Sequence, residues 1–384
     1  MTMPHWMQEQ HTMIRDAVRR FAEAEIAPQS EQLWHDEAFP YDIWRQAAQL
    51  GFTGLPYPSA YNGGDGDWLS FVIVLEELAR VDCAVANALM ANSTVASLLN
   101  NYGTHEQKQA FLAPILNGER VGAIGLSEPN AGSDAANIAT RATRESDQWV
   151  INGSKTFISN SGTNITGPVV IAAVTGERSD GKKEIASFIV PAGTPGFNTG
   201  RKLRKIGWRA SSTCELFFED CRIPAGHLLG ERGAGLRQTL AQISTGRILI
   251  GALALGILQG SLDRATAYMQ ERKAFGKTLS HFQALQFKLA DMATDAHAAR
   301  LMLYDAAAKK DAGVPFDQEA SMAKLLSTER AMQAAHQALQ IHGGYGIMSE
   351  YPVSRAFGDA KVLEIVEGTS EIQRMIISRH LLAR

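Results

Sequence analysis

The stretch QWVINGSKTFISN, residues 148–160, has the strand pattern that distinguishes the middle of the chain from the helical patterns on both sides. Its apolar and polar residues alternate, which is the pattern of a strand with one buried face. Further β-rich runs, PVVIAAV, ASFIVP and CELFFEDCRIP, follow before about residue 230. We therefore predict a sheet in the middle of the chain, from about residue 121 to 230.

Helical patterns flank the predicted sheet on both sides. From about residue 7 to 115, apolar residues recur at intervals of three and four, interrupted by the turn-rich PYPSAYNGGDGDWLS. After GERGAG we predict long helices at residues 234–271, 280–312, 317–342 and 369–382. The chain is therefore predicted to be α+β, with domains at residues 1–119, 120–232 and 233–384.

Composition excludes several classes of protein. The 384 residues are 45% apolar and 20% charged, and the net charge of -3 provides no basic face for nucleic acid or an acidic membrane. The run ILIGALALGILQG, residues 248–260, is too short to span a bilayer and is interpreted as a buried helix. The cysteines at 83, 214 and 221 form no CxxC pair, which favours a reducing compartment. The N-terminus lacks a signal-type apolar core, so we predict a cytoplasmic protein.

Two short patterns are set aside. SMAK, residues 321–324, has the S-x-x-K spacing of penicillin-recognising enzymes, but it lies in an amphipathic helix pattern without the accompanying motifs. We interpret it as helix surface. The histidines do not fall in an HExxH or comparable spacing, so no metal site is predicted.

Small residues in GLSEPNAGSDAANI, residues 125–138, leave backbone N–H groups open after a short strand. With hydroxyl donors at Ser127 and Ser133, this loop could hold a phosphate, although an ordinary turn after a strand explains it equally well. In KTFISN, residues 155–160, a strand would point Phe157 and Ser159 to the same face, an arrangement suited to a flat heterocycle. Core packing beside a solvated serine is the alternative.

Two motifs in the C-terminal part have equally plain alternatives. In RKAFGK, Arg272 and Phe275 are predicted to share a helix face, with Gln283 following, but a lone exposed arginine is usually only solvated. QIHGGYG, residues 340–346, ends a helix with two adjacent glycines, as a glycine C-cap would.

The stretch VEGTSEIQR, residues 366–374, places Glu367 between an apolar run and a glycine. A helix start is expected around Thr369 and Ser370, and Ser370 and Gln373 have the spacing of a capping box. The local alternative is a solvated glutamate in a turn.

In this order, the segments resemble the acyl-CoA dehydrogenase family, flavoenzymes that desaturate acyl-CoA thioesters. The resemblance covers essentially the whole chain, and its short-chain branch is the most similar. The motifs that carry it are YNGGDG, LSEPNAGSD, INGSKTFISN, KIGWRASSTCELFFEDCRIP, GRILIGALALGI, RKAFGK, FKLADMA, QIHGGYG and VEGTSEIQR.

The resemblance implies an N-terminal helical domain, a central β-barrel or sandwich domain and a C-terminal four-helix bundle, assembled as a homotetramer. It implies FAD between the β domain and the bundle, partly held by a neighbouring subunit, and transfer of electrons to an electron-transferring flavoprotein. The implied contacts to flavin or its pyrophosphate are Leu126, Ser127, Gly132, Ser133, Phe157 and Ser159. The implied contacts to the neighbour's FAD are Arg272, Phe275, Gln283, Gln340, Gly343 and Gly344, with Thr369 and Glu371 completing the pocket. The implied substrate contacts are Ser133, Arg247 and Gly368.

By the same resemblance, Glu367 is the base that removes the α-proton of the thioester while hydride leaves the β-carbon for flavin N5. Apolar Ile365 and Val366 would help to desolvate the carboxylate and raise its pKa, whereas the following helix start would lower it. Some relatives carry the base immediately before the arginine that corresponds to Arg247. That residue is Gly246 here, which favours Glu367.

Two residues depart from the family pattern. Phe157 replaces a common tryptophan, and Gly358 in FGDAK replaces a common arginine, which puts flavin stacking and a local ion pair in question.

Three functions are considered. The favoured function is acyl-CoA dehydrogenation, with short or branched acyl groups expected and terpenoid or aryl-acyl thioesters as alternatives. An oxidase or flavin monooxygenase of the same fold is second, and a non-catalytic acyl-CoA-binding protein is third.

Overall fold

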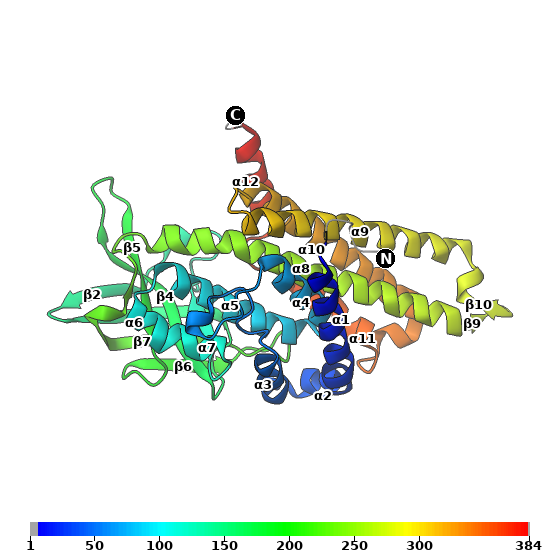
Figure 1. Ribbon diagram of the computed structural model, residues 1–384, viewed down its shortest axis with the longest axis horizontal. Helices are drawn as coiled ribbons and strands as arrows, with labels where there is room; N and C mark the ends of the chain where they lie inside the picture. The colour runs from blue at the N-terminus through cyan, green and yellow to red at the C-terminus, as the bar shows by residue number, and fades with distance from the viewer. Residues whose placement is uncertain (1–6, 383–384) are drawn as a thin grey trace.

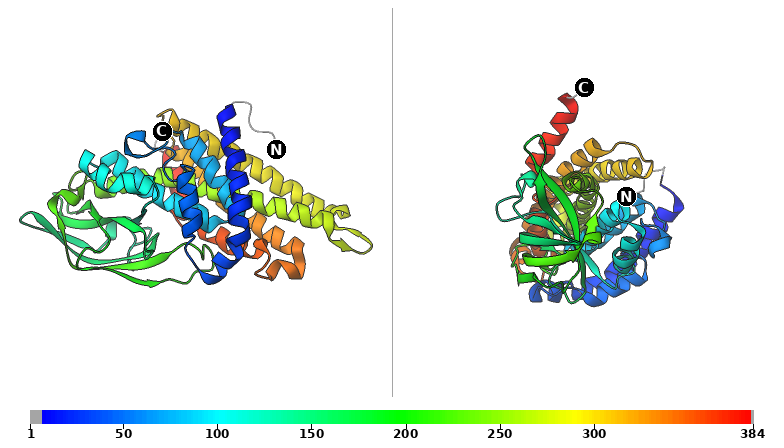
Figure 2. Two further views of the ribbon diagram at one scale, coloured as in Figure 1. Left: turned by 60° about the horizontal axis from the view of Figure 1, so that its bottom comes forward. Right: turned by 90° about the vertical axis from the view of Figure 1, so that its left-hand side faces the viewer.

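The computed structural model describes residues 7–382. The molecule is elongated, with the β domain at one end and long helices running from it to the other (Figure 1). The N-terminal helices lie across the middle, on one side of the long helices (Figure 2). The predicted α+β arrangement of helices, sheet and helices is confirmed. The boundaries at residues 119/120 and 232/233 remain our proposal, and both fall in connections between elements.

The N-terminal helices are capped where the sequence supplies acids. Asp67 begins α4 by accepting a hydrogen bond from the Ser70 N–H, and Asp82 begins α5 by accepting from the N–H groups of Ala84 and Val85. Nearly all of α4 and α5 is buried, because these two helices lie between the outer helices and the bundle. The helices of this part are α1 (Glu9–Phe21), α2 (Ala27–Asp36), α3 (Tyr41–Gln49), α4 (Trp68–Val81), α5 (Cys83–Tyr102), α6 (His105–Gln107) and α7 (Ala113–Leu116).

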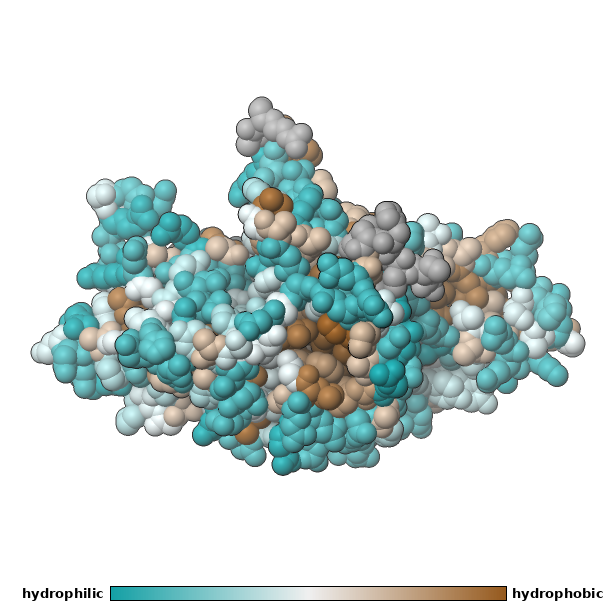
Figure 3. All heavy atoms as spheres, viewed as in Figure 1, coloured by the Kyte–Doolittle hydropathy of each residue, from teal (hydrophilic) through white to brown (hydrophobic). Residues whose placement is uncertain are grey.

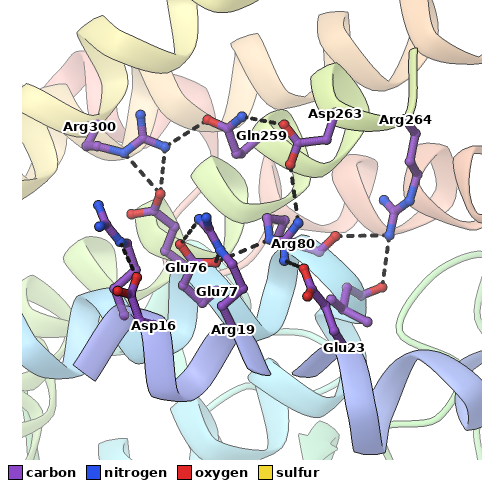
Figure 4. Close-up of polar contacts among 12 residues, drawn as sticks. Asp16, Arg19, Glu23, Glu76, Glu77, Arg80, Gln259, Asp263, Arg264 and Arg300 are labelled. Carbon is purple, nitrogen blue, oxygen red and sulfur yellow. Dashed lines mark hydrogen bonds and ion pairs between the residues drawn. The ribbon is translucent and has the colours of Figure 1, made fainter. Parts of the chain in front are cut away.

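Buried ion pairs fasten the N-terminal helices to the bundle (Figure 4). Glu76 on α4 accepts hydrogen bonds from the Arg300 guanidinium, at 2.6 Å from Nη2, and from the Tyr304 hydroxyl at 2.6 Å. Next to it, Glu77 accepts a hydrogen bond from Arg19 Nη2 at 2.7 Å, which joins α4 to α1 within the N-terminal part. A carboxylate as deeply buried as Glu76 is tolerated only when paired, so its contacts with Arg300 and Tyr304 fix how the two helical parts are docked.

The middle part forms one mixed sheet with its own apolar core. Its strand order is β6-β7-β3-β2-β4-β5-β8, with β1 parallel to β4. The pairing of β3 with β7 shifts between Lys155 and Ile158, and Phe157 there has a left-handed φ of 62°. The strands are β1 (Val121–Gly125), β2 (Arg141–Glu145), β3 (Gln148–Ser159), β4 (Thr166–Glu177), β5 (Lys183–Val190), β6 (Phe197–Lys202), β7 (Thr213–Pro224) and β8 (Leu228–Leu229).

The C-terminal part is built on α8, which has 37 residues. Among residues 7–382, α8 alone is long and apolar enough to cross a membrane, but 83% of its most apolar window is buried inside the protein, which confirms the predicted buried helix. The predicted helices are confirmed to within a few residues, and α11 is an additional one. The elements are α8 (Gly235–Glu271), β9 (Lys273–Ala274), β10 (Lys277–Thr278), α9 (Gln283–Asp311), α10 (Asp317–His342), α11 (Pro352–Leu363) and α12 (Ser370–Leu382).

Gly358 on α11 makes a close backbone contact with the β domain. A Cβ at Gly358 would lie 2.3 Å from the Ile206 carbonyl oxygen, and a Cβ at Gly207 would lie 2.4 Å from the Gly358 carbonyl oxygen. The two glycines thus let the backbones meet, and a side chain at residue 358 would collide with the Ile206 carbonyl group.

Candidate active site

Glu367 lies in the connection between α11 and α12, with its carboxylate against α8. A Cβ at Gly246 would lie 2.6 Å from Glu367 Oε2 and 3.1 Å from its Cδ, so α8 leaves space for the carboxylate only because residue 246 is a glycine. Glu367 has a left-handed φ of 52°, and Gly368 follows with a φ of 89°. The backbone thus turns sharply at the residue that carries the acid.

Electrostatic conditions at Glu367 suit a proton acceptor. Oε2 is buried and has no hydrogen-bond partner, although the residue as a whole is only partly buried. Burial raises the pKa of Glu367, while the cations of Arg247 and Lys324 lower it. An unpaired, desolvated carboxylate next to positive charge can take up a proton from a weak carbon acid.

Two buried side chains hold the backbone around Glu367. Lys324 Nζ donates to the Gly368 carbonyl oxygen at 2.9 Å and the Glu364 carbonyl oxygen at 3.4 Å. Gln373 Nε2 donates to the same Gly368 oxygen at 2.8 Å and to the Glu367 oxygen at 3.2 Å. Hydrogen bonds from Lys324 on α10 and Gln373 on α12 therefore fix the backbone that carries the Glu367 carboxylate.

Two predictions near Glu367 are wrong. Ser370 and Gln373 do not form a capping box: Thr369 precedes the helix and accepts from the Ile372 N–H at 3.4 Å, while the buried Ser370 Oγ has no partner. SMAK is not helix surface, because both Ser321 and Lys324 are fully buried.

The expected shielding of Glu367 by Ile365 is also wrong. The Ile365 side chain is 56% exposed, whereas Val366 packs against the core. Oε2 is instead enclosed from the α8 side, at Gly246.

The stretch predicted to hold a phosphate, residues 125–138, begins at the last residue of β1, and its first part is anchored on β3. Lys155, fully buried, places Nζ 2.7 Å from Glu128 Oε1 and 3.3 Å from the Leu126 carbonyl oxygen. Glu128 also accepts from the N–H of Thr140 at 3.1 Å. Burial lowers the pKa of Lys155 to about 8, against the opposing effect of Glu128. The ion pair thus fixes a loop whose outer residues, Gly132 and Ser133, are exposed.

Phe157 and Ser159 lie beside this loop, since the Thr156 N–H donates to the Ser127 carbonyl oxygen at 3.0 Å. The Phe157 ring is 70% exposed, while Ser159 is partly buried. We refer to Leu126, Ser127, Gly132, Ser133, Phe157 and Ser159 as the loop set. Leu126 packs against the same apolar cluster as Leu236, which places the loop set near the start of α8.

A second group of predicted residues lies beyond the other end of α8. Arg272 follows the last helical residue, and Phe275 sits in the turn between β9 and β10 with a φ of 51°, so the prediction of a shared helix face is wrong. Arg272 stacks on Tyr345, 5.7 Å from its ring centre, which brings the hairpin next to the end of α10. We refer to Arg272, Phe275, Gln283, Gln340, Gly343 and Gly344 as the hairpin set.

The structure therefore divides the predicted site residues into three places. Arg247 and Gly368 lie with Glu367, where Thr369 precedes α12 and the exposed Glu371 lies in its first turn. The loop set and the hairpin set lie at opposite ends of the molecule (Figure 1). In Figure 3 the most hydrophobic patch lies near the middle of the face, with a smaller one toward the hairpin end. Phe275 is 95% exposed.

Several polar residues near the site were missed by the sequence analysis. Lys324 and Gln373 both donate to the Gly368 carbonyl oxygen, next to Glu367, and Lys155 and Glu128 anchor the loop. Gln242 lies one helical turn before Gly246, buried and with Nε2 unpaired. Polar residues at positions that a helix or strand pattern predicts to be buried would have been the signal.

Comparisons with known proteins match nearly the whole chain to one protein family. Family models described as the N-terminal, middle and C-terminal domains of acyl-CoA dehydrogenase match residues 8–119, 123–221 and 233–382. The short-chain specific acyl-CoA dehydrogenase of Clostridium acetobutylicum is 43% identical, over 97% of this chain and 98% of that protein.

Two solved structures share the fold throughout. Butyryl-CoA dehydrogenase from Megasphaera elsdenii has a TM-score of 0.95 and 39% identity, covering 99% of this chain and 100% of its own. A chain from a study of the electron transferring flavoprotein of Acidaminococcus fermentans has a TM-score of 0.96 and 40% identity, covering all of both chains. The chain belongs to the acyl-CoA dehydrogenase family and is an oxidoreductase that acts on acyl-CoA.

Proposed function

We propose that this chain is an FAD-dependent acyl-CoA dehydrogenase in which Glu367 removes the α-proton of the thioester. The observation that carries this proposal is the unpaired, buried Glu367 Oε2 in the space left by Gly246. A C–H bond next to a thioester is a poor acid, so its base must be desolvated and held in place. Burial and the carbonyl contacts of Lys324 and Gln373 provide both conditions.

The loop set fits a flavin nucleotide. Phe157 presents an exposed ring to a flat heterocycle, with the Ser159 hydroxyl two residues away. Nothing lies within 4 Å of the position of a Cβ at Gly132, so its backbone is open to a phosphate, with Ser127 and Ser133 as hydroxyl donors. When bound, FAD supplies the acceptor for the hydride that leaves the β-carbon. We propose that the loop set holds the flavin side of the cofactor.

The separation of the two residue sets supports an oligomer with shared sites. A helix of 37 residues is about 55 Å long, and α8 has the loop set near its start and the hairpin set beyond its end. One cofactor cannot reach both sets within one chain. Gly246 lies in the first third of α8, so Glu367 is nearer the loop set. We propose that the hairpin set binds the FAD of a neighbouring subunit in a homotetramer.

Relatives support the finer assignments. Short acyl chains are proposed because the Clostridium relative is named as short-chain specific and the Megasphaera structure as a butyryl-CoA dehydrogenase. An electron-transferring flavoprotein is proposed as the acceptor because that protein is the subject of the Acidaminococcus study. A cytoplasmic location is supported by three free, buried thiols, Cys83, Cys214 and Cys221.

The experiment that tests this function is an anaerobic titration of the FAD-bound protein with a panel of acyl-CoAs, following the visible absorbance of oxidised flavin. Wild type is expected to bleach with short or branched chains, and Glu367→Gln to bind them without bleaching. Glu364→Gln is the matched control, because its carboxylate lies three residues earlier and pairs with Lys361. It should bleach as wild type does.

Other results separate the competing functions. Fast reoxidation of the bleached protein by air would indicate an oxidase or monooxygenase. Binding of acyl-CoA without bleaching in wild type would indicate a binding protein. Bleaching in Glu367→Gln at the wild-type rate would exclude Glu367 as the base.

A further inference from the structure

Lys324 is a fully buried lysine whose ammonium group faces the segment that carries Glu367. It lies on α10, and its Nζ contacts the carbonyl oxygens of Gly368 and Glu364, on either side of the base. We call residues 365–369 the base segment. Among residues 7–382, no carboxylate lies within ion-pair distance of Lys324 Nζ. A buried ammonium held only by backbone carbonyls is costly to retain, which points to a role beyond packing.

We propose that Lys324 is a positioning residue for the reaction, whose ammonium group holds the base segment so that the Glu367 carboxylate stays in the space next to Gly246. This inference rests on the proposed role of Glu367 as base. Lys324 acts through the backbone, since its Nζ donates hydrogen bonds to the Gly368 and Glu364 carbonyl oxygens.

The backbone of the base segment requires such support. Glu367 is a non-glycine residue with a φ of 52°, a conformation that persists only where the surroundings hold it. The Gly368 carbonyl oxygen receives two donors, Lys324 Nζ from α10 and Gln373 Nε2 from α12. Of these two donors only Lys324 carries a charge, so replacing each in turn separates anchoring from electrostatics.

Electrostatics gives Lys324 a second, measurable effect on Glu367. The positive charges of Lys324 and Arg247 lower the pKa of Glu367 against the larger effect of burial. Burial lowers the pKa of Lys324 itself to about 8, opposed chiefly by Glu367 and Glu364. The remaining charges that act on this cluster are Asp317 at the start of α10, through Arg247, and Glu371 on α12, through Lys324. Loss of the Lys324 charge should therefore raise the pKa of Glu367.

The test compares three variants in the holoenzyme. Lys324→Met removes charge and donors, and we expect kcat to fall about 10- to 100-fold while the acid limb of the kcat–pH profile moves to higher pH. Gln373→Leu removes only neutral donors, so kcat should fall while the acid limb stays. Ser327→Ala, at a fully buried position on the next turn of α10, should change neither.

A second readout does not depend on turnover. The infrared band of the protonated Glu367 carboxyl, identified by its absence from Glu367→Gln, is followed against pH in wild type and Lys324→Met. The band should persist to higher pH in Lys324→Met. Lys324→Gln, which is neutral but keeps a donor, should give the same shift and replaces Lys324→Met if that variant does not fold.

The outcomes distinguish this inference from the function on which it rests. If wild type oxidises acyl-CoA and Glu367→Gln does not, but the neutral variants keep the wild-type acid limb and infrared titration, the role of Lys324 is overturned. If wild type oxidises no thioester, the proposed function fails, and the infrared titration alone decides whether Lys324 controls the carboxyl.

Discussion

Glu367 and Gly246 fit together as a carboxylate and the space left by a missing side chain, with Oε2 2.6 Å from where a Cβ at Gly246 would lie. The two residues come from a connection and a long helix more than a hundred positions apart in the sequence. Real Cβ atoms do not approach an oxygen this closely. A side chain at residue 246 would therefore displace the carboxylate.

Gly246→Ala is expected to reduce activity without reducing stability. The new methyl group would push the carboxylate away, and a shift of about 1 Å can cost on the order of 100-fold in rate. Alanine is the better helix former by about 1 kcal/mol, so the thermal unfolding temperature should not fall. Activity is measured as kcat and stability as a melting curve. The control is Leu240→Ala, at an exposed position on α8. Unchanged kcat would show that the carboxylate does not need this space.

The profile of kcat against pH should have a single acid limb, which reports the protonation of Glu367. Burial raises the pKa of Glu367 above its ordinary 4.5, and a protonated carboxyl cannot accept the α-proton. The rate should therefore be lost as pH decreases through a value above 4.5, and be retained on the alkaline side of that limb. The measurement is kcat against pH with α-deuterated and ordinary substrate, which shows that proton removal is the step observed. A limb at or below 4.5 would contradict the desolvated base.

The Lys155–Glu128 ion pair should matter for both stability and cofactor retention. Lys155→Met would leave Glu128 buried without its cation beneath the loop set, which typically costs about 3–5 kcal/mol. Denaturant unfolding and the FAD content of the purified protein measure the two effects. Lys182→Met breaks only an exposed pair with Asp180 and should cost at most about 1 kcal/mol. Equal effects of the two variants would argue against a structural role for the buried pair.

The regular elements were predictable from the sequence because their patterns are long. The helix α10 was expected at residues 317–342 and has those bounds, since an apolar stripe of that length marks its own ends. The helix α11 was not predicted, because it has only 12 residues and begins at Pro352, a residue that favours turns equally well.

The details of the site were not predictable, because they depend on partners distant in the sequence. A helix pattern cannot show that Lys324 faces carbonyl groups 40 residues later, so SMAK was interpreted as surface. Thr369 and Ser370 both carry hydroxyl groups suited to an N-cap, and the choice between them depends on where the base segment enters the helix. By contrast, the exposure of Gly132 and Ser133 agrees with the local pattern of small residues, which requires no distant partner.

Two inactive variants should restore each other if neighbouring subunits share a site. Glu367→Gln removes the base and Arg272→Glu repels the phosphates of a neighbour's FAD, so each variant alone should be inactive. In mixed oligomers, a chain with intact Glu367 can pair with a neighbour whose Arg272 is intact, and random pairing should restore about a quarter of the wild-type activity. Specific activity after co-expression measures this, with the two purified proteins mixed without subunit exchange as the control. Because α8, about 55 Å long, separates the two residue sets within a chain, lack of recovery in verified mixed oligomers would mean that the hairpin set does not serve the site of Glu367.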